Sequence, residues 1–198
     1  MIELVPPTYV APLDLLAIFG RIAPLDVDLG CGNGDLICEL ARQKPERNFL
    51  GIEKLASRVA SVCRKAAALK NVRVLKVENS YAVRYLLPED SVDTFFLLFP
   101  DPWPKRRHHR RRVMHADFLD SVHRTLAEAG LFHIATDQGD YFTQIERLAA
   151  DDSRFEKIDN EGETGCEQEQ NFHVADIRHW QASHRCWKLS CLHAAALP

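Results

Sequence analysis

A carboxylate, a tryptophan and a basic octamer stand together in one proline-rich stretch, residues 99–112. The stretch follows Thr94–Phe99, a short apolar run that predicts a buried strand. Prolines at 100, 102 and 104 prevent a regular continuation, because proline lacks a backbone N–H and restricts the residue before it. Asp101 is therefore expected in a stiff loop at the carboxyl end of a central strand, where open α/β sheets bind ligands.

The basic octamer, Lys105–Arg112, holds six Lys or Arg side chains and two His side chains. Such a local field suits a phosphate backbone. The formal net charge of −3 shows that the chain is not basic as a whole, so any nucleic-acid contact must come from this patch. A charge run is usually only a solvated surface. Its position directly after Asp101 and Trp103 favours a binding role.

A glycine-rich turn, residues 28–34, lies between a predicted strand and a predicted helix. Gly30, Gly32 and Gly34 allow a close approach of the backbone to a ligand and place N–H groups at a helix N-terminus. Dinucleotide-binding turns have the spacing G-x-G-x-x-G. Here the spacing is G-x-G-x-G with Asp28 directly before it, which disfavours a nicotinamide oxidoreductase.

Two further polar positions follow the next predicted strands. Glu53 lies about twenty residues after the glycines, where an acid accepts hydrogen bonds from ribose hydroxyls. The alternative role for Glu53 is to cap the next helix. Glu78 and Asn79 follow the third strand, and either of them is a candidate for a base contact.

The apolar patterns that must position these residues alternate between strand and helix five times. We predict strands over 26–29, 49–53, 72–77, 94–99 and 131–136, and helices over 35–44, 56–69, 81–87, 113–129 and 141–150. The alternation predicts an α/β fold with a doubly wound, mostly parallel sheet.

The ends of the chain carry weaker patterns. We predict a lead-in over residues 1–24, with a short helix at 14–19. An acidic loop or arm is predicted over 151–178, and it is read as loop up to 170. A last strand is predicted over 186–192. We predict one domain over residues 1–198.

Several classes of protein are disfavoured by the composition. No apolar run approaches a membrane span, and the first residues do not resemble a signal peptide, so a cytoplasmic protein without membrane contact is expected. The six cysteines show no zinc-type pairing, and the Cys and His residues of the tail match no metal-site spacing. We therefore predict no metal.

The segment Pro100–Lys105 with the following Arg and His residues resembles the signature of the bacterial tRNA (guanine-N7)-methyltransferases, which depend on S-adenosylmethionine. The resemblance runs from about Asp26 to about Tyr141. It implies the class I S-adenosylmethionine-dependent methyltransferase fold, tRNA as partner and a monomer or homodimer.

The same resemblance assigns roles to individual residues. Asp28, Gly30, Gly32, Gly34, Glu53, Asn79 and Asp101 would bind the cofactor, with Asp101 also the catalytic residue. Lys105 and Asp137 would bind the substrate. The RNA would contact Arg107, His108, His109, Arg110, Arg111 and Arg112.

The reaction that this family catalyses is compatible with acidic residues at the site. Guanine N7 has a free lone pair and no proton, so methyl transfer needs no general base but only alignment. Positive charge moves to the purine ring, and nearby carboxylates favour it. Asp101 and Asp137 are the best-placed acids, and they can also accept hydrogen bonds from guanine N1–H and its amino group.

One family element is missing, a T-x-x-E motif that closes over the guanine. Its expected place is Ala175–Arg178, and a literal match occurs earlier, at Thr164–Glu167. The leading hypothesis is therefore a tRNA guanine-N7 methyltransferase. The alternatives are a catalytically weak relative that binds RNA and a methyltransferase for another substrate.

Overall fold

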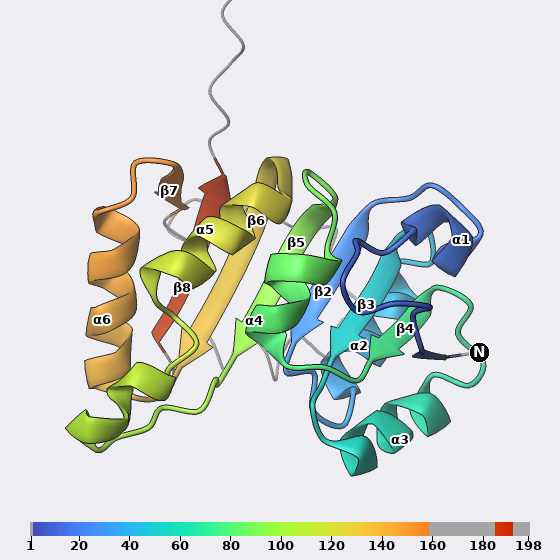
Figure 1. Cartoon of the computed structure of the whole chain (residues 1–198), viewed down its shortest axis with the longest axis horizontal. Coiled ribbons are helices and arrows are strands. Elements are labelled where there is room, and N and C mark those ends of the chain that lie inside the picture. The colour runs from blue at the N-terminus through green and yellow to red at the C-terminus, as the bar shows by residue number, and fades with distance from the viewer. Residues whose placement is uncertain (1, 159–184, 192–198) are drawn as a thin grey trace, which may run out of the picture.

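The computed structural model describes residues 2–158 and 185–191, which form one eight-stranded sheet in the order β1-β4-β3-β2-β5-β6-β8-β7 (Figure 1). The strands are β1 (Glu3–Leu4), β2 (Leu25–Leu29), β3 (Asn48–Ile52), β4 (Val72–Leu75), β5 (Val92–Leu98), β6 (Leu126–Thr136), β7 (Phe155–Ile158) and β8 (Arg185–Cys191). Neighbours from β1 to β6 pair in parallel, whereas β8 is antiparallel to both β6 and β7. The doubly wound, mostly parallel sheet is confirmed.

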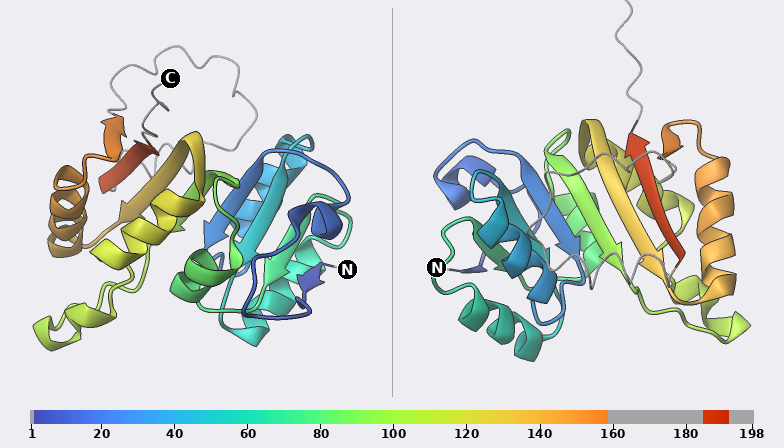
Figure 2. Two further views of the ribbon diagram at one scale, coloured as in Figure 1. Left: turned by 45° about the horizontal axis from the view of Figure 1, so that its top comes forward. Right: turned by 180° about the vertical axis from the view of Figure 1, so that it is seen from behind.

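The helical elements are α1 (Leu15–Phe19), α2 (Asp35–Gln43), α3 (Ala56–Lys65), α4 (Asn79–Tyr81), the π-helical turn η1 (Ala82–Leu86), the 3₁₀ turn η2 (Arg106–Arg111), α5 (Ala116–Thr125) and α6 (Gly139–Ala150). They cover both faces of the sheet (Figure 2). One core cluster contains buried side chains of α2 and α3, and the other contains those of α1, η1, α5 and α6. No helix in the described part of the chain is long and apolar enough to cross a membrane.

The predicted helix over 113–129 is too long at both ends. Helix α5 ends at Thr125, and the next residue already belongs to β6. Leu126 pairs with Val92 at the start of β5, and the carbonyl of Thr125 accepts a hydrogen bond from Ser91 N–H at 3.0 Å. Pairing with a distant strand therefore ends the helix four residues before the predicted end at residue 129.

The end of the described chain also differs from its prediction. Residues 155–158, predicted as loop, form strand β7, and Phe155 is buried against His123 at 5.8 Å between ring centroids. This strand pairs with β8, which confirms the predicted last strand within one residue at each end. The remainder of the acidic arm lies outside the described residues.

The glycine-rich turn packs closely on β3. A Cβ atom on Gly51 would lie 2.7 Å from Cys31 Sγ and 3.3 Å from Ile37 Cδ1. Residue 51 must therefore be glycine for the turn after β2 to rest against the middle of β3.

Gly51→Ala should destabilise the protein by about 1–3 kcal/mol, because the added methyl group overpacks a closed site. The measurement is the free energy of unfolding in urea. The double variant Gly51→Ala with Cys31→Ala should recover part of that stability, since Sγ is the nearest atom. Equal stability of wild type and Gly51→Ala would contradict the close packing.

Candidate active site

The candidate site lies where the strand order reverses, between the neighbouring strands β2 and β5. Helices α2 and α5 leave these strands toward opposite faces, which opens a crevice at the carboxyl edge of the sheet. A cavity of about 440 Å³ occupies this place. Its walls include Gly30 after β2, Glu53 after β3, Asn79 after β4, and Asp101 after β5.

The glycine-rich turn adopts a conformation that ordinary residues avoid. Gly30, Gly32 and Gly34 all have positive φ angles, of 78°, 55° and 79°. The N–H groups of Gly30 and Cys31 donate to the carbonyl of Ile52 at 2.8 and 3.0 Å, which fixes the turn to β3. The turn thus forms a fixed backbone cradle with little side-chain bulk beside the cavity.

Asp28 lies at the base of this cradle and is only 6% exposed. Burial, and secondarily the negative charge of Glu53, raises the pKa of Asp28 from 3.8 to about 7. A cationic ligand group beside such a buried carboxyl group stabilises its ionised form. The α-amino group of a methionine moiety is such a group, so the residues present fit S-adenosylmethionine.

The position of Glu53 is compatible with both roles considered from the sequence, ribose binding and helix capping. Its carboxylate accepts hydrogen bonds from Leu55 N–H at 2.9 Å, at the start of α3, and from Gly32 N–H at 3.2 Å. It also forms part of the cavity wall, with Arg58 Nη1 3.6 Å away. Glu53 therefore joins the turn to α3 and faces the ligand space.

Glu78 and Asn79 both line the cavity, but their side chains make different contacts. Glu78 caps helix α4, since its carboxylate accepts a hydrogen bond from Tyr81 N–H at 2.9 Å. The amide Nδ2 of Asn79 lies 3.5 Å from the position of a Cβ on Gly30, so this amide faces the glycine turn. Of the two, Asn79 is the better placed for a contact with a ligand in the cradle.

The loop that carries Asp101 has an unusual backbone. Phe99 and Trp103 have φ angles of 51° and 43°, a region that bulky residues rarely adopt. The carboxylate of Asp101 is 70% exposed at the cavity, 3.8 Å from Lys54 Nζ. Asp101 is thus presented toward the ligand space on a constrained loop.

The two predicted substrate contacts lie outside the cavity wall. Asp137 is exposed directly after β6, at the same edge of the sheet as Asp101, because β5 and β6 are parallel. Lys105 is exposed at the start of the turn η2. The structure therefore brings Asp101 and Asp137 to one edge, whereas neither Asp137 nor Lys105 lines the cavity itself.

Most of the basic octamer is exposed on η2, which projects from the carboxyl edge beside the first turn of α6 (Figure 1). Arg107 and Arg110 are exposed, and His108 and His109 are half-buried. The guanidinium carbon of Arg111 lies 4.9 Å from the ring centroid of Trp103, and both side chains line the cavity. The patch is therefore continuous with the ligand space.

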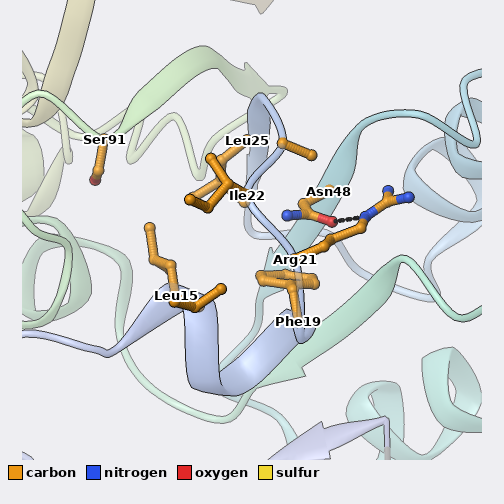
Figure 3. Close-up of a pocket in the computed structure, with 9 residues that line it drawn as sticks. Leu15, Phe19, Arg21, Ile22, Leu25, Asn48 and Ser91 are labelled. Carbon is orange, nitrogen blue, oxygen red and sulfur yellow. Dashed lines mark hydrogen bonds between the residues drawn. The ribbon is translucent and has the colours of Figure 1, made fainter.

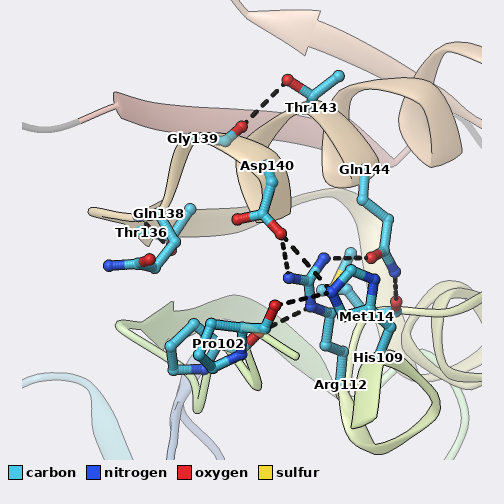
Figure 4. Close-up of polar contacts among 11 residues, drawn as sticks. Pro102, His109, Arg112, Met114, Thr136, Gln138, Gly139, Asp140, Thr143 and Gln144 are labelled. Atoms are coloured by element: carbon cyan, nitrogen blue, oxygen red, sulfur yellow. Dashed lines mark hydrogen bonds and ion pairs between the residues drawn. The ribbon is translucent and has the colours of Figure 1, made fainter. Parts of the chain in front are cut away.

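Arg112 differs from its neighbours and corrects its predicted grouping with the RNA-binding residues. Its side chain is only 2% exposed, and its guanidinium contacts Asp140 and Gln144 of α6 (Figure 4). The hydrogen bond from Arg112 lowers the pKa of Asp140. Arg112 is thus part of the packed structure rather than of the exposed patch.

The sequence reasoning missed the cations at the rim of the cavity. Lys54 directly follows Glu53, and Arg58 lies in the first turn of α3. In the sequence, only their proximity to Glu53 pointed to these two residues. Among the described residues, no group of three or more His, Cys, Asp or Glu side chains could hold a metal ion, and the Cys and His positions of 166–184 lie outside that part.

A second, smaller hollow of about 180 Å³ lies near the amino ends of β2, β3 and β5 (Figure 3). Leu15, Phe19 and Ile22 give it apolar walls, and Arg21 Nε donates to Asn48 Oδ1 at 2.8 Å. It contains no acid and lies at the edge of the sheet opposite to the glycine turn. This hollow is not the candidate active site.

Comparison with known proteins agrees with this geometry. Residues 22–183 match a family model described as "Putative methyltransferase". A tRNA (guanine-N(7)-)-methyltransferase of Nitrosococcus oceani is 37% identical over 90% of this chain and 75% of its own length. The chain belongs to the tRNA (guanine-N7)-methyltransferase family. A relative with the same description from Halorhodospira halophila is 41% identical over 73% of this chain, which spans 63% of that relative.

Solved structures support the fold. An antibiotic-resistance methyltransferase, Kmr, superposes with a TM-score of 0.61 at 16% identity, over 96% of both chains. An S-adenosyl-L-methionine-dependent methyltransferase from Methanococcus maripaludis gives a TM-score of 0.59 at 10% identity, over 93% of this chain and 84% of that one. The class I S-adenosylmethionine-dependent methyltransferase fold predicted from the sequence is confirmed.

Asp28→Asn should stabilise the cofactor-free protein, and more so at pH 8 than at pH 5. The pKa of Asp28 is about 7 in the folded state and 3.8 ordinarily, so its ionisation opposes folding increasingly as the pH rises between these values. Thermal unfolding should therefore show a clearly larger gain in Tm at pH 8 than at pH 5.

The same variant should bind S-adenosylmethionine at least about tenfold more weakly, because it cannot form a charge-assisted hydrogen bond at this position. Asp117→Asn, at an exposed position of α5, is the matched control for both measurements. A Tm change for Asp28→Asn that is the same at the two pH values would contradict the buried, destabilising carboxylate.

Proposed function

We propose that this chain transfers a methyl group from S-adenosylmethionine to N7 of a guanine in tRNA. One observation carries the proposal: Gly30 of the glycine cradle, which directly follows the strand that carries the buried Asp28, and Asp101 of the constrained loop line a single cavity that continues into a basic surface. Family membership supports the same reaction. We also propose that the protein is cytoplasmic, consists of a single domain and acts as a monomer or homodimer.

S-adenosylmethionine supplies an electrophilic methyl group on a sulfonium. The protein's share is to hold it and the base in line at near-attack distance. In this proposal Asp28 and Glu53 bind the cofactor beside the glycine turn, whose lack of side chains allows a close approach, and Asn79 contacts its base. The fixed attachment of the turn to Ile52 keeps these groups in place without reorganisation.

Asp101 and Asp137 would orient the target guanine. Each carboxylate can accept hydrogen bonds from guanine N1–H and the exocyclic amino group, which turns N7 toward the methyl group. Their negative charges also favour the positive charge that the purine ring acquires during transfer. No general base is required, because N7 carries no proton.

The exposed residues of the basic octamer, with Lys105 beside the substrate, would contact tRNA phosphates. Of the cations on η2, only Arg111 lines the cavity, and the exposed ones extend from it along the same turn. This arrangement suits a polyanion that covers the entrance while one base enters.

Incubation of unmodified tRNA transcripts with S-adenosylmethionine and the protein should produce N7-methylguanosine, detected by mass spectrometry of nucleosides. Asp101→Ala should lower kcat at least about 100-fold while leaving cofactor affinity within a few-fold, because Asp101 acts on the base. Glu128→Ala is the matched control, since Glu128 is exposed near the amino end of β6.

The outcomes separate the candidate functions. An active Asp101→Ala variant would contradict the assigned site. Intact cofactor and tRNA binding without any methylated guanosine would favour the RNA-binding relative. Methylation at another atom or in another substrate would favour the third candidate. The segments 164–167 and 175–178, considered as replacements for the T-x-x-E motif, lie outside the described residues.

Arg107→Ala and Arg110→Ala should each weaken tRNA binding, because each removes a cation that faces the phosphates. Each should also reduce the slope of log K against log salt by about 0.7–0.9, the value for one phosphate neutralised. The measurement is a binding titration at several salt concentrations. Lys70→Ala is the matched control, because Lys70 is exposed before β4 at the opposite edge of the sheet. Unchanged slopes for both arginine variants would remove η2 from the tRNA interface.

A further inference from the structure

We propose that Arg112 is a positioning residue that locks the Asp101 loop and the basic turn η2 onto helix α6. In this role it sets the geometry of the reaction without touching tRNA. The inference deepens the proposed function and rests on it. It separates one arginine of the octamer from five other cations that look the same in the sequence.

Arg112 bonds to three residues in two parts of the chain, the Asp101 loop and α6 (Figure 4). Its Nε donates to the carbonyl of Pro102 at 2.8 Å, and its Nη1 donates to Gln144 Oε1 at 2.8 Å. Its Nη2 pairs with the carboxylate of Asp140. The guanidinium carbon also lies 4.6 Å from the ring centroid of Tyr141. These contacts occupy all three guanidinium nitrogens and one face of the group.

The neighbouring backbone is tied to the same face of α6. Met114 N–H donates to the hydroxyl of Tyr141 at 3.1 Å, and Gln144 Nε2 donates to the carbonyl of Met114 at 2.9 Å. Gln144 thus bonds both to Arg112 and to the residue two positions later. These contacts join Pro102, at the start of the loop, to Arg112 and Met114, at its end, and join both ends to α6. The segment that carries η2 is therefore closed at its base.

This closure lies between the two acids of the site. Pro102 directly follows Asp101, and α6 begins two residues after Asp137. By fastening Pro102 to α6, Arg112 fixes the relative position of the segments that carry the two carboxylates. Alignment errors of about 1 Å can cost about 100-fold in rate, so a residue that fixes this separation affects kcat.

The side-chain type suits this role. Arginine presents a rigid planar fork that can serve several acceptors at once and stack on an aromatic ring, whereas lysine has a compact, flexible charge. A residue that only attracts phosphate would tolerate lysine. Arg112 is also buried to 2% exposure, so it has no open surface for a phosphate group. The contacts therefore favour a structural lock.

The experiment compares Arg112→Lys and Asp140→Asn with Arg110→Lys as the matched control. Both lock variants should raise amide hydrogen exchange over residues 101–111 and lower kcat about 10- to 100-fold, with cofactor affinity within a few-fold. The control, which keeps an exposed charge, should leave hydrogen exchange at the wild-type level.

Asp140→Asn gives the sharpest distinction, because Asp140 is half exposed and acidic. Removing its negative charge should leave tRNA affinity unchanged or raise it, so a lower kcat would not come from weaker tRNA binding. The salt slope of tRNA binding should match wild type for both lock variants, since neither change removes a cation that faces a phosphate. Because Asp140 is only half buried, this variant also tests the role if Arg112→Lys fails to fold.

Three results would overturn the inference. Wild-type hydrogen exchange in Asp140→Asn would show that the contacts do not hold the loop, and wild-type kcat in that variant would show that the hold does not serve the reaction. A lower salt slope in Arg112→Gln, which removes the positive charge, would assign Arg112 to the tRNA. A wild-type protein that binds the cofactor but methylates no tRNA would instead overturn the proposed function, and the positioning role in that reaction with it.

Discussion

Parallel pairing of β2 with β5 is the constraint on which the rest of the structure depends. Asp26, Val27 and Asp28 pair with Thr94, Phe95 and Phe96, although some seventy residues separate the two strands. This register brings the glycine turn and the Asp101 loop out of the sheet at one edge. Because the chain continues toward opposite faces from these two strands, the space between their ends stays open for a ligand.

Charge is distributed around this space in two zones. Asp28 and Glu53 lie buried on the cofactor side, where the cost of ionising Asp28 is offset when a cationic group binds. Lys54, Arg58 and Arg111 lie at the rim, and Arg111 belongs to η2. An acidic interior suits a sulfonium cofactor and a purine that becomes positive, while a basic rim suits phosphates. The two zones adjoin, since Arg58 Nη1 lies 3.6 Å from the carboxylate of Glu53, whereas Arg112 belongs to neither zone because its guanidinium is packed against α6.

The loop between these zones is held in a conformation that its own residues do not favour. Phe99 and Trp103 have positive φ angles, and such a backbone persists only where surrounding contacts impose it. The hydrogen bond from Phe99 N–H to the carbonyl of Ala135 fixes one end of the loop at 2.8 Å, and Arg112 fixes the other through Pro102. The stiffness attributed to the prolines alone is thus shared with long-range contacts.

The sequence by itself determined the features that depend on local pattern. The alternating apolar runs specified the five central strands and the parallel sheet, and the G-x-G-x-G turn with Asp28 specified the cofactor side, because propensity and spacing act over a few residues. Only the tertiary structure decided where α5 ends, that residues 155–158 form a strand, and which cations line the cavity. Arg112 shows the reason most clearly: it belongs to the same basic run as Arg110 and Arg111, and its contacts with Pro102 and with Asp140 and Gln144, which lie 28 and 32 residues away, distinguish it.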